Sequence, residues 1–149
     1  MPTFMQNADR IVGGEVAPSM IPWQVAMLSG SFQFCGGTIL DSCTILSAAH
    51  CGINKAHTIR AGSKKRKQGG QVRSIQRIIS NNDLPYNDIT SDNDWVILKL
   101  SSPLELNDNV FPACLPEADY LDISSTEEAC FTSGWGTLAS GMIRIIIFI

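Results

Sequence analysis

The chain has 149 residues, of which 44% are hydrophobic and 17% are charged, and this composition is typical of a globular domain with one buried core. A net charge of −3 at pH 7 argues against general affinity for nucleic acid or for an anionic membrane surface. No apolar run is long enough to cross a bilayer, so we expect no membrane span.

The charges are distributed unevenly along the chain. Residues 55–77 contain eight basic side chains and no acidic one, whereas residues 78–128 contain eleven carboxylates and Lys99 as their one base. The densest basic run, residues 64–67, precedes Gly69 and Gly70 and is most simply a solvated loop. A patch that binds polyanions and a protease-sensitive site are the alternatives for this run.

Five cysteines is an odd number, so at least one of them is unpaired or pairs outside this chain. This use of cysteine suggests an oxidising compartment. Residues 1–7 have neither a basic n-region nor an apolar h-region, so they do not form a signal peptide. We reconcile the two observations by expecting a secreted protein whose N-terminus is incomplete here.

The first ten residues are short and polar and are interpreted as a leader. They end at Arg10, which is followed by Ile11, Val12 and two glycines. Cleavage after Arg10 would give Ile11 a new ammonium group on a segment flexible enough to swing inward. The alternative is an ordinary loop that enters the first strand.

The body of the chain is predicted to consist of short strands separated by Gly, Pro, Asn and Asp. The strands are expected at residues 23–28, 33–40, 44–49, 58–61, 71–79 and 95–100. The sixth has Val96, Leu98 and Leu100 on one face, and the fifth follows a broken alternation. Helical character is confined to one turn around residues 48–53. The pattern predicts an all-β fold, an antiparallel six-stranded barrel.

The third predicted strand leads into His50, one of two histidines in the chain. A histidine held at the end of a buried strand can keep one ring nitrogen on a nucleophile, as a general base requires. Histidine side chains in general have a reference pKa of ~6.5, so this residue type can accept and return a proton near neutral pH. From these residues alone, a structural histidine beside a disulfide is an equally good interpretation.

The linker between the fifth and sixth strands is rich in Asn and Asp, which usually form turns. Asp83, Asp88 and Asp92 are interpreted in that way. Asp94 differs because it borders the apolar strand, where a carboxylate is partly buried and needs a partner. His50 is the candidate partner.

After residue 100 the chain becomes rich in loops, and two prolines around Cys114 favour an extended crossing segment over a sheet interior. Residues 130–137 are predicted to begin a new unit with one strand. Seven of the last eight residues, 142–149, are apolar, and the run is typical of an aggregation-prone strand.

Seven segments together resemble the chymotrypsin/trypsin-like serine endopeptidases. They occur in the family's order and at family-like spacing over residues 10–140, which a chance match does not explain. The segments are RIVGG at residues 10–14, PWQV at 22–25, CGGTI at 35–39, LSAAHC at 46–51, DNDWVIL at 92–98, ACLP at 113–116 and SGWG at 133–136.

The resemblance implies a role for each matching residue. His50 would be the general base and later the general acid, and Asp94 would orient its ring and stabilise its charged form. Arg10 would be the activation cleavage site of a zymogen, cut either by a separate activating protease or by the mature enzyme itself. Ile11 would then be the new N-terminus, whose ammonium is buried against an aspartate beside the nucleophile. The substrate of the full-length form would be a polypeptide.

The resemblance also assigns cysteines. Cys35 and Cys51 match the disulfide that brackets the histidine. This bond would close a loop of about fifteen residues, for which the chain-entropy model gives a stabilisation of ~3 kcal/mol. Cys114 and Cys130 match family cysteines whose partners lie outside this sequence. Cys43 has no family counterpart, and a pair between Cys43 and Cys114 is an alternative.

No cofactor and no metal are expected. The basic loop at residues 64–70 falls where some relatives bind calcium through carboxylates, and this loop contains none.

The chain also departs from the family pattern. The family's nucleophile lies downstream in a Gly-Asp-Ser-Gly-Gly segment, which these 149 residues do not contain. Family domains are double barrels of roughly 200–250 residues. We therefore expect the first barrel, the crossing segment and one strand of the second barrel. The expected division is an activation-peptide remnant at 1–10, a truncated protease domain at 11–140 and a non-family apolar tail at 141–149.

Without the nucleophile, the oxyanion-hole amides and the specificity pocket, the chain as given is predicted to be inactive, as a fragment of a serine endopeptidase. The first alternative is a non-catalytic protease homologue that acts as a binding module. The second is a truncated product without a function, because a lone first barrel would expose apolar surface.

Overall fold

The computed structural model describes residues 17–65, 67–116 and 132–136. The predictions for Arg10, Ile11, Cys130 and the apolar tail therefore lie outside the described residues. The described part of the chain contains no helix of the length and apolar character that a membrane crossing needs.

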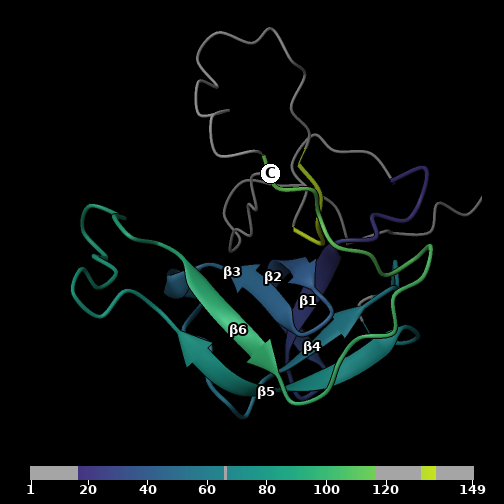
Figure 1. Ribbon diagram of the computed structural model, residues 1–149, viewed down its shortest axis with the longest axis horizontal. Coiled ribbons are helices and arrows are strands. Elements are labelled where there is room, and N and C mark those ends of the chain that lie inside the picture. Colours follow the sequence, from purple (N-terminus) through teal and green to yellow (C-terminus); the bar gives the residue numbers. More distant parts are fainter. Residues whose placement is uncertain (1–16, 66, 117–131, 137–149) are drawn as a thin grey trace, which may run out of the picture.

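Six antiparallel strands close into a barrel in the order β1-β2-β3-β6-β5-β4 (Figure 1). A one-turn 3-10 helix, η1 (Ala49–Cys51), follows β3. The predicted six-stranded antiparallel barrel is confirmed, and each strand lies within two residues of its predicted bounds. The strands are β1 (Gln24–Ser29), β2 (Phe32–Asp41), β3 (Thr44–Ser47), β4 (Thr58–Ala61), β5 (Gln71–Ile79) and β6 (Val96–Leu100).

The barrel interior is filled by alternate residues of the strands, because successive side chains of a strand point to opposite faces. In β6 the predicted face is the buried one, and Val96, Leu98 and Leu100 are each no more than 4% exposed. Their burial removes apolar surface from water, which is the main favourable term in folding. The core cluster consists of Val25, Met27, Cys35, Ile39, Ile45, Ile59, Ala61, Ile75, Val96, Leu98, Leu100, Leu104 and Val110.

The broken alternation of β5 has a physical cause in its pairing with β6. The register between the two strands shifts between Ile75 and Arg77, as it does at a β-bulge. Ile75 is buried before the shift, and Ile78 packs against the core after it. Val72 belongs to the outer face and is 42% exposed. The bulge therefore lets β5 return an apolar side chain to the core with irregular spacing.

The predicted crossing segment passes along the barrel and contributes to its core. Its Leu104 and Val110 are buried. Its backbone is tied to the strand ends, since Phe111 N–H donates to Pro22 O at 3.1 Å and Ala113 N–H donates to Ile39 O at 2.9 Å. Figure 1 shows this segment in green, running from the end of β6 around the barrel.

The described residues 132–136 lie against the first barrel. Ser133 Oγ–H donates to Gln24 Oε1 at 2.7 Å, and Trp135 Nε1–H donates to Lys64 O at 2.8 Å. These five residues contain no assigned strand, and the remainder of the strand expected at 130–137 lies outside the described residues.

Gly70 directly precedes β5, at a point where the backbone of β4 leaves no space for a side chain. Its φ is +64°, and a Cβ placed there would lie 2.1 Å from the carbonyl oxygen of Ala61. Gly30, in the turn between β1 and β2, has a similar φ of +60°, but no atom lies within 4 Å of a Cβ placed there. The two glycines therefore share a backbone conformation, but only at Gly70 would an added Cβ collide with other atoms.

We expect Gly70→Ala to destabilise the chain more than Gly30→Ala. Gly30→Ala should lose only the free energy that a non-glycine residue needs to adopt the left-handed conformation, roughly 1–2 kcal/mol. Gly70→Ala carries the same term and must also displace backbone, for which a further 1–3 kcal/mol is typical. Urea unfolding followed by tryptophan fluorescence measures both. Equal losses for the two variants would contradict the close approach of Gly70 to β4.

Candidate active site

The register between β3 and β6 brings together two side chains that lie far apart in the sequence. Ser47, the last residue of β3, pairs with Val96, the first residue of β6. His50 follows Ser47 by three residues, and Asp94 precedes Val96 by two. Because antiparallel strands place the end of one beside the start of the other, both side chains meet at this edge of the barrel.

Asp94 holds His50 through both of its carboxylate oxygens. The ring nitrogen Nδ1 of His50 lies 2.6 Å from Oδ2, and the backbone N–H of His50 donates to Oδ1 at 2.8 Å. The two bonds act on different groups of one residue, so they fix the ring and the backbone of η1 together. The predicted partnership of His50 and Asp94 is thus present as a contact.

Asn93 forms a tight turn directly before Asp94, and the sequence-based predictions did not single it out. Asn93 has a left-handed backbone with φ of +57°, and Trp95 N–H donates back to its carbonyl oxygen at 2.8 Å. Asn is among the few residues that adopt this conformation readily. The Asn between two aspartates was the available signal, since it marks a tight turn directly before the strand.

The contact with Asp94 decides which ring nitrogen of His50 is basic. An ionised carboxylate only accepts hydrogen bonds, so the neutral ring carries its proton on Nδ1 and leaves a lone pair on Nε2. Nε2 lies 3.8 Å from Cys51 Sγ. That sulfur belongs to a disulfide and has no proton to donate, so the Nε2 lone pair stays available. The arrangement can therefore accept a proton from a group placed beside Nε2.

The electrostatics of Asp94 favour its ionised form. Desolvation by partial burial acts to raise its pKa, but hydrogen bonds from the backbone N–H and the ring of His50, and the charge of that ring, outweigh it. The pKa of Asp94 is therefore lowered below its ordinary value of 3.8. The side chains of His50 and Asp94 are 42% and 27% exposed, so the pair lies at the surface.

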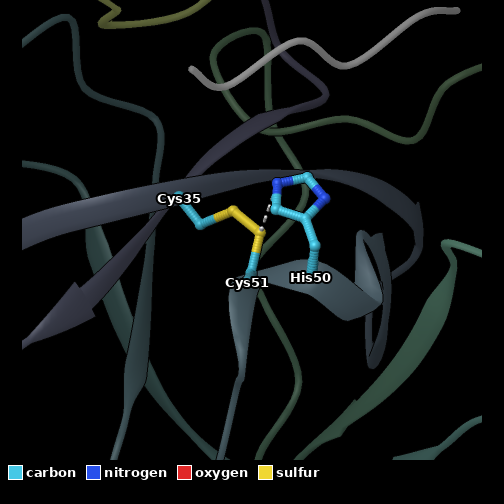
Figure 2. A group of neighbouring side chains, drawn as sticks. All are labelled: Cys35, His50 and Cys51. Atoms are coloured by element: carbon cyan, nitrogen blue, oxygen red, sulfur yellow. Dashed lines mark hydrogen bonds between the residues drawn. A yellow bond between two sulfur atoms is a disulfide. The ribbon is translucent and has the colours of Figure 1, made fainter. Parts of the chain in front are cut away.

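A disulfide between Cys35 and Cys51 ties η1 to the barrel (Figure 2). Cys35 lies in β2 and is buried, while Cys51 directly follows His50 on η1. The bond thus attaches the short helix to β2. Cys43 and Cys114 are free thiols, so the alternative pairing between these two is not formed.

The seven sequence segments and this geometry can now be set beside known proteins. A family-wide sequence comparison matches residues 11–144 to the family described as Trypsin. The chain belongs to the trypsin family. Trypsin-4 of Rattus norvegicus is 36% identical over 140 residues, which cover 91% of this chain and 54% of that protein. The chain thus spans about half the length of this curated relative.

Two solved structures of this family's fold resemble the chain. One is a scabies mite inactivated protease paralogue, with a TM-score of 0.62, 29% identity, and coverage of 71% of this chain and 46% of the other. The second is human heparin binding protein, with a TM-score of 0.73, 26% identity, and coverage of 86% of this chain and 58% of the other.

The second histidine of this trypsin-family barrel has a different environment. The ring of His57 lies against that of Phe34, with centroids 4.5 Å apart, and its Nδ1 accepts a hydrogen bond from Asn54 N–H at 3.2 Å. These contacts are those of a packed loop residue. His57 therefore serves as a matched control for substitutions of His50.

We expect the contact between Asp94 and His50 to make stability depend on acid pH. Because the folded-state pKa of Asp94 is depressed, its contribution is complete above the ordinary value of 3.8 and is lost as pH falls through the folded-state pKa. The difference in free energy of unfolding between the wild type and Asp94→Asn should therefore shrink from about pH 5 to about pH 2.

Urea unfolding at a series of pH values measures this difference. Asp83→Asn removes one charge from the same linker and serves as the control. A wild-type advantage over Asp94→Asn that stays constant across this range would contradict the assignment.

Proposed function

We propose that this chain is the N-terminal part of a serine endopeptidase in which His50 is the general base and Asp94 is the carboxylate that orients it. The observation that carries the proposal is the double contact of Asp94 with the ring and the backbone of His50. It leaves Nε2 as a fixed proton acceptor, which is what acyl transfer to a serine requires.

In the proposed reaction, the serine comes from sequence that follows this chain in its longer relatives. His50 Nε2 accepts the hydroxyl proton as the serine oxygen attacks a peptide carbonyl. The carboxylate of Asp94 stabilises the imidazolium that forms. The ring then donates its proton to the leaving amine, and a water activated in the same way releases the acyl group.

Membership of the trypsin family also supports proposals about how the protein is activated and where it is located. The family match begins at residue 11, directly after Arg10, and this supports cleavage there to release Ile11 as a new N-terminus. We propose polypeptide substrates, an activating protease that cuts after Arg10, and an oxidising, extracellular compartment. The Cys35–Cys51 disulfide supports the compartment, since such bonds persist mainly outside the cytosol.

We expect the 149-residue chain alone to remain unlabelled by a fluorophosphonate probe for activated serines, because His50 and Asp94 form a base without a nucleophile. Gel fluorescence after incubation with the probe measures this. Covalent labelling of this chain would overturn the proposed division of the catalytic residues.

The companion experiment uses a chain extended with the family's second barrel and activated after Arg10. Its labelling rate should fall roughly 10²- to 10⁴-fold in His50→Ala, the usual contribution of a general base. His57→Ala should leave the rate unchanged, because its ring belongs to a packed loop. Equal rates for the wild type and His50→Ala would exclude His50 as the base.

A second candidate function is a binding module for polyanions, and the basic loop favours it. Lys64, Lys65 and Lys67 are exposed, and no ion pair involving them occurs among the residues that the structure describes. The ammonium of Lys64 donates instead to the neutral carbonyl of Ala17 at 3.0 Å. Two similar structures are named as an inactivated paralogue and a heparin binding protein, which supports a non-catalytic reading.

We expect the chain to bind heparin-agarose if this second function holds, and Lys64→Ala/Lys65→Ala to elute at lower salt. The loop charges would attract a sulfated polysaccharide, and added salt screens that attraction. Lys55→Ala removes an exposed charge outside the loop and should shift elution less. Passage of the wild type through the column at low salt would exclude the binding module.

A further inference from the structure

Three atoms that metals prefer lie close together at His50. They are Nε2 of His50 and the Sγ atoms of Cys35 and Cys51, and all lie within 4.8 Å of one another. Figure 2 shows the imidazole ring lying beside the two sulfurs, which come from β2 and η1. The disulfide occupies both sulfurs in this structure, and a metal binds thiolates instead.

We propose that reduction of the Cys35–Cys51 disulfide converts this group into a zinc site with two thiolate ligands and one imidazole ligand. Three protein ligands with a fourth position left for water is a common zinc arrangement. Zn²⁺ binds thiolate and imidazole ligands, whereas Ca²⁺ and Mg²⁺ prefer oxygen ligands. The sequence predicts no metal, and the proposal departs from that prediction.

The distances suit a tetrahedral ion with little movement of the backbone. Zn–S bonds of about 2.3 Å and Zn–N bonds of about 2.0–2.1 Å place a sulfur and a nitrogen ligand about 3.6 Å apart. Nε2 and Cys51 Sγ are already 3.8 Å apart. The two Cα atoms are 6.2 Å apart, so rotation of the cysteine side chains can separate the sulfurs while β2 and η1 stay in place.

Asp94 supplies the support that a zinc-bound histidine needs. A ligating imidazole usually donates its other N–H to a carboxylate, which fixes the ring and its tautomer. Here Nδ1 of His50 lies 2.6 Å from Asp94 Oδ2, so the lone pair is on Nε2, which lies 3.8 Å from Cys51 Sγ. The ring would accept zinc without changing its tautomer or its partner.

Reduction of the Cys35–Cys51 disulfide requires a dithiol reductant. The dithiol transfers two electrons and two protons to the S–S bond, giving two cysteine thiols and an oxidised, cyclic disulfide of the reductant. Binding of Zn²⁺ then releases the two thiol protons as the thiolates coordinate the ion. The ion takes the Nε2 lone pair, so a zinc-loaded chain has no free base at His50.

The experiment uses the 149-residue chain with Cys43→Ser, Cys114→Ser and Cys130→Ser, so that Cys35 and Cys51 are its only cysteines. We expect the reduced chain to bind one Zn²⁺ and to show thiolate-to-cobalt charge-transfer absorption with Co²⁺. The chain oxidised to the disulfide should show neither. Equal zinc affinity in the two redox states would overturn the proposal.

Two variants test whether the folded site, and not merely a pair of thiols, holds the ion. His50→Ala should weaken zinc binding, and His57→Ala should not. Asp94→Asn should weaken it roughly 10- to 100-fold, as loss of a carboxylate behind a ligating histidine does. An unfolded reduced chain would bind zinc without sensing Asp94, so an unchanged affinity in Asp94→Asn would also overturn the proposal. Each of these outcomes concerns zinc affinity, so none depends on peptidase activity.

Discussion

The pairing of β3 with β6 is the constraint on which the site depends, because it joins two strands that β4, β5 and their loops separate in the sequence. Four residue pairs, from Thr44 with Lys99 to Ser47 with Val96, set this register. A shift by one residue would reverse which side chains face the core, so the buried face of β6 also fixes the position of Asp94. The geometry of the His50–Asp94 pair thus follows from core packing.

His50 is held by two different kinds of bond. The carboxylate of Asp94 contacts both its ring and its backbone, and the disulfide fixes the next residue to β2. Such double fixation limits rotation of a side chain that is 42% exposed. Exposure is what a proton acceptor needs in order to meet another group, whereas fixation is what keeps Nε2 in one place.

The chain belongs to the trypsin family and spans about half the length of a curated relative. Both findings agree with a structure that consists mainly of one barrel. A barrel with its own core can bring His50 and Asp94 together, since the two residues lie just beyond the paired ends of β3 and β6. In the proposed function, the catalytic serine comes from sequence outside these 149 residues. The same ring also faces two sulfurs, so the redox state of the chain bears on what the imidazole can bind.

The sequence by itself determined the strands, because period-two burial and turn residues are local signals that β6 and β4 carry plainly. It also singled out His50 and Asp94, through the border position of the carboxylate and the family resemblance. Only the tertiary structure decided that Asp94 contacts the backbone N–H as well as the ring, that Asn93 turns left-handed before it, and that the sulfurs lie beside Nε2. Those features arise from the closure of the barrel, which places residues 44 positions apart in contact and leaves no periodic trace in the chain.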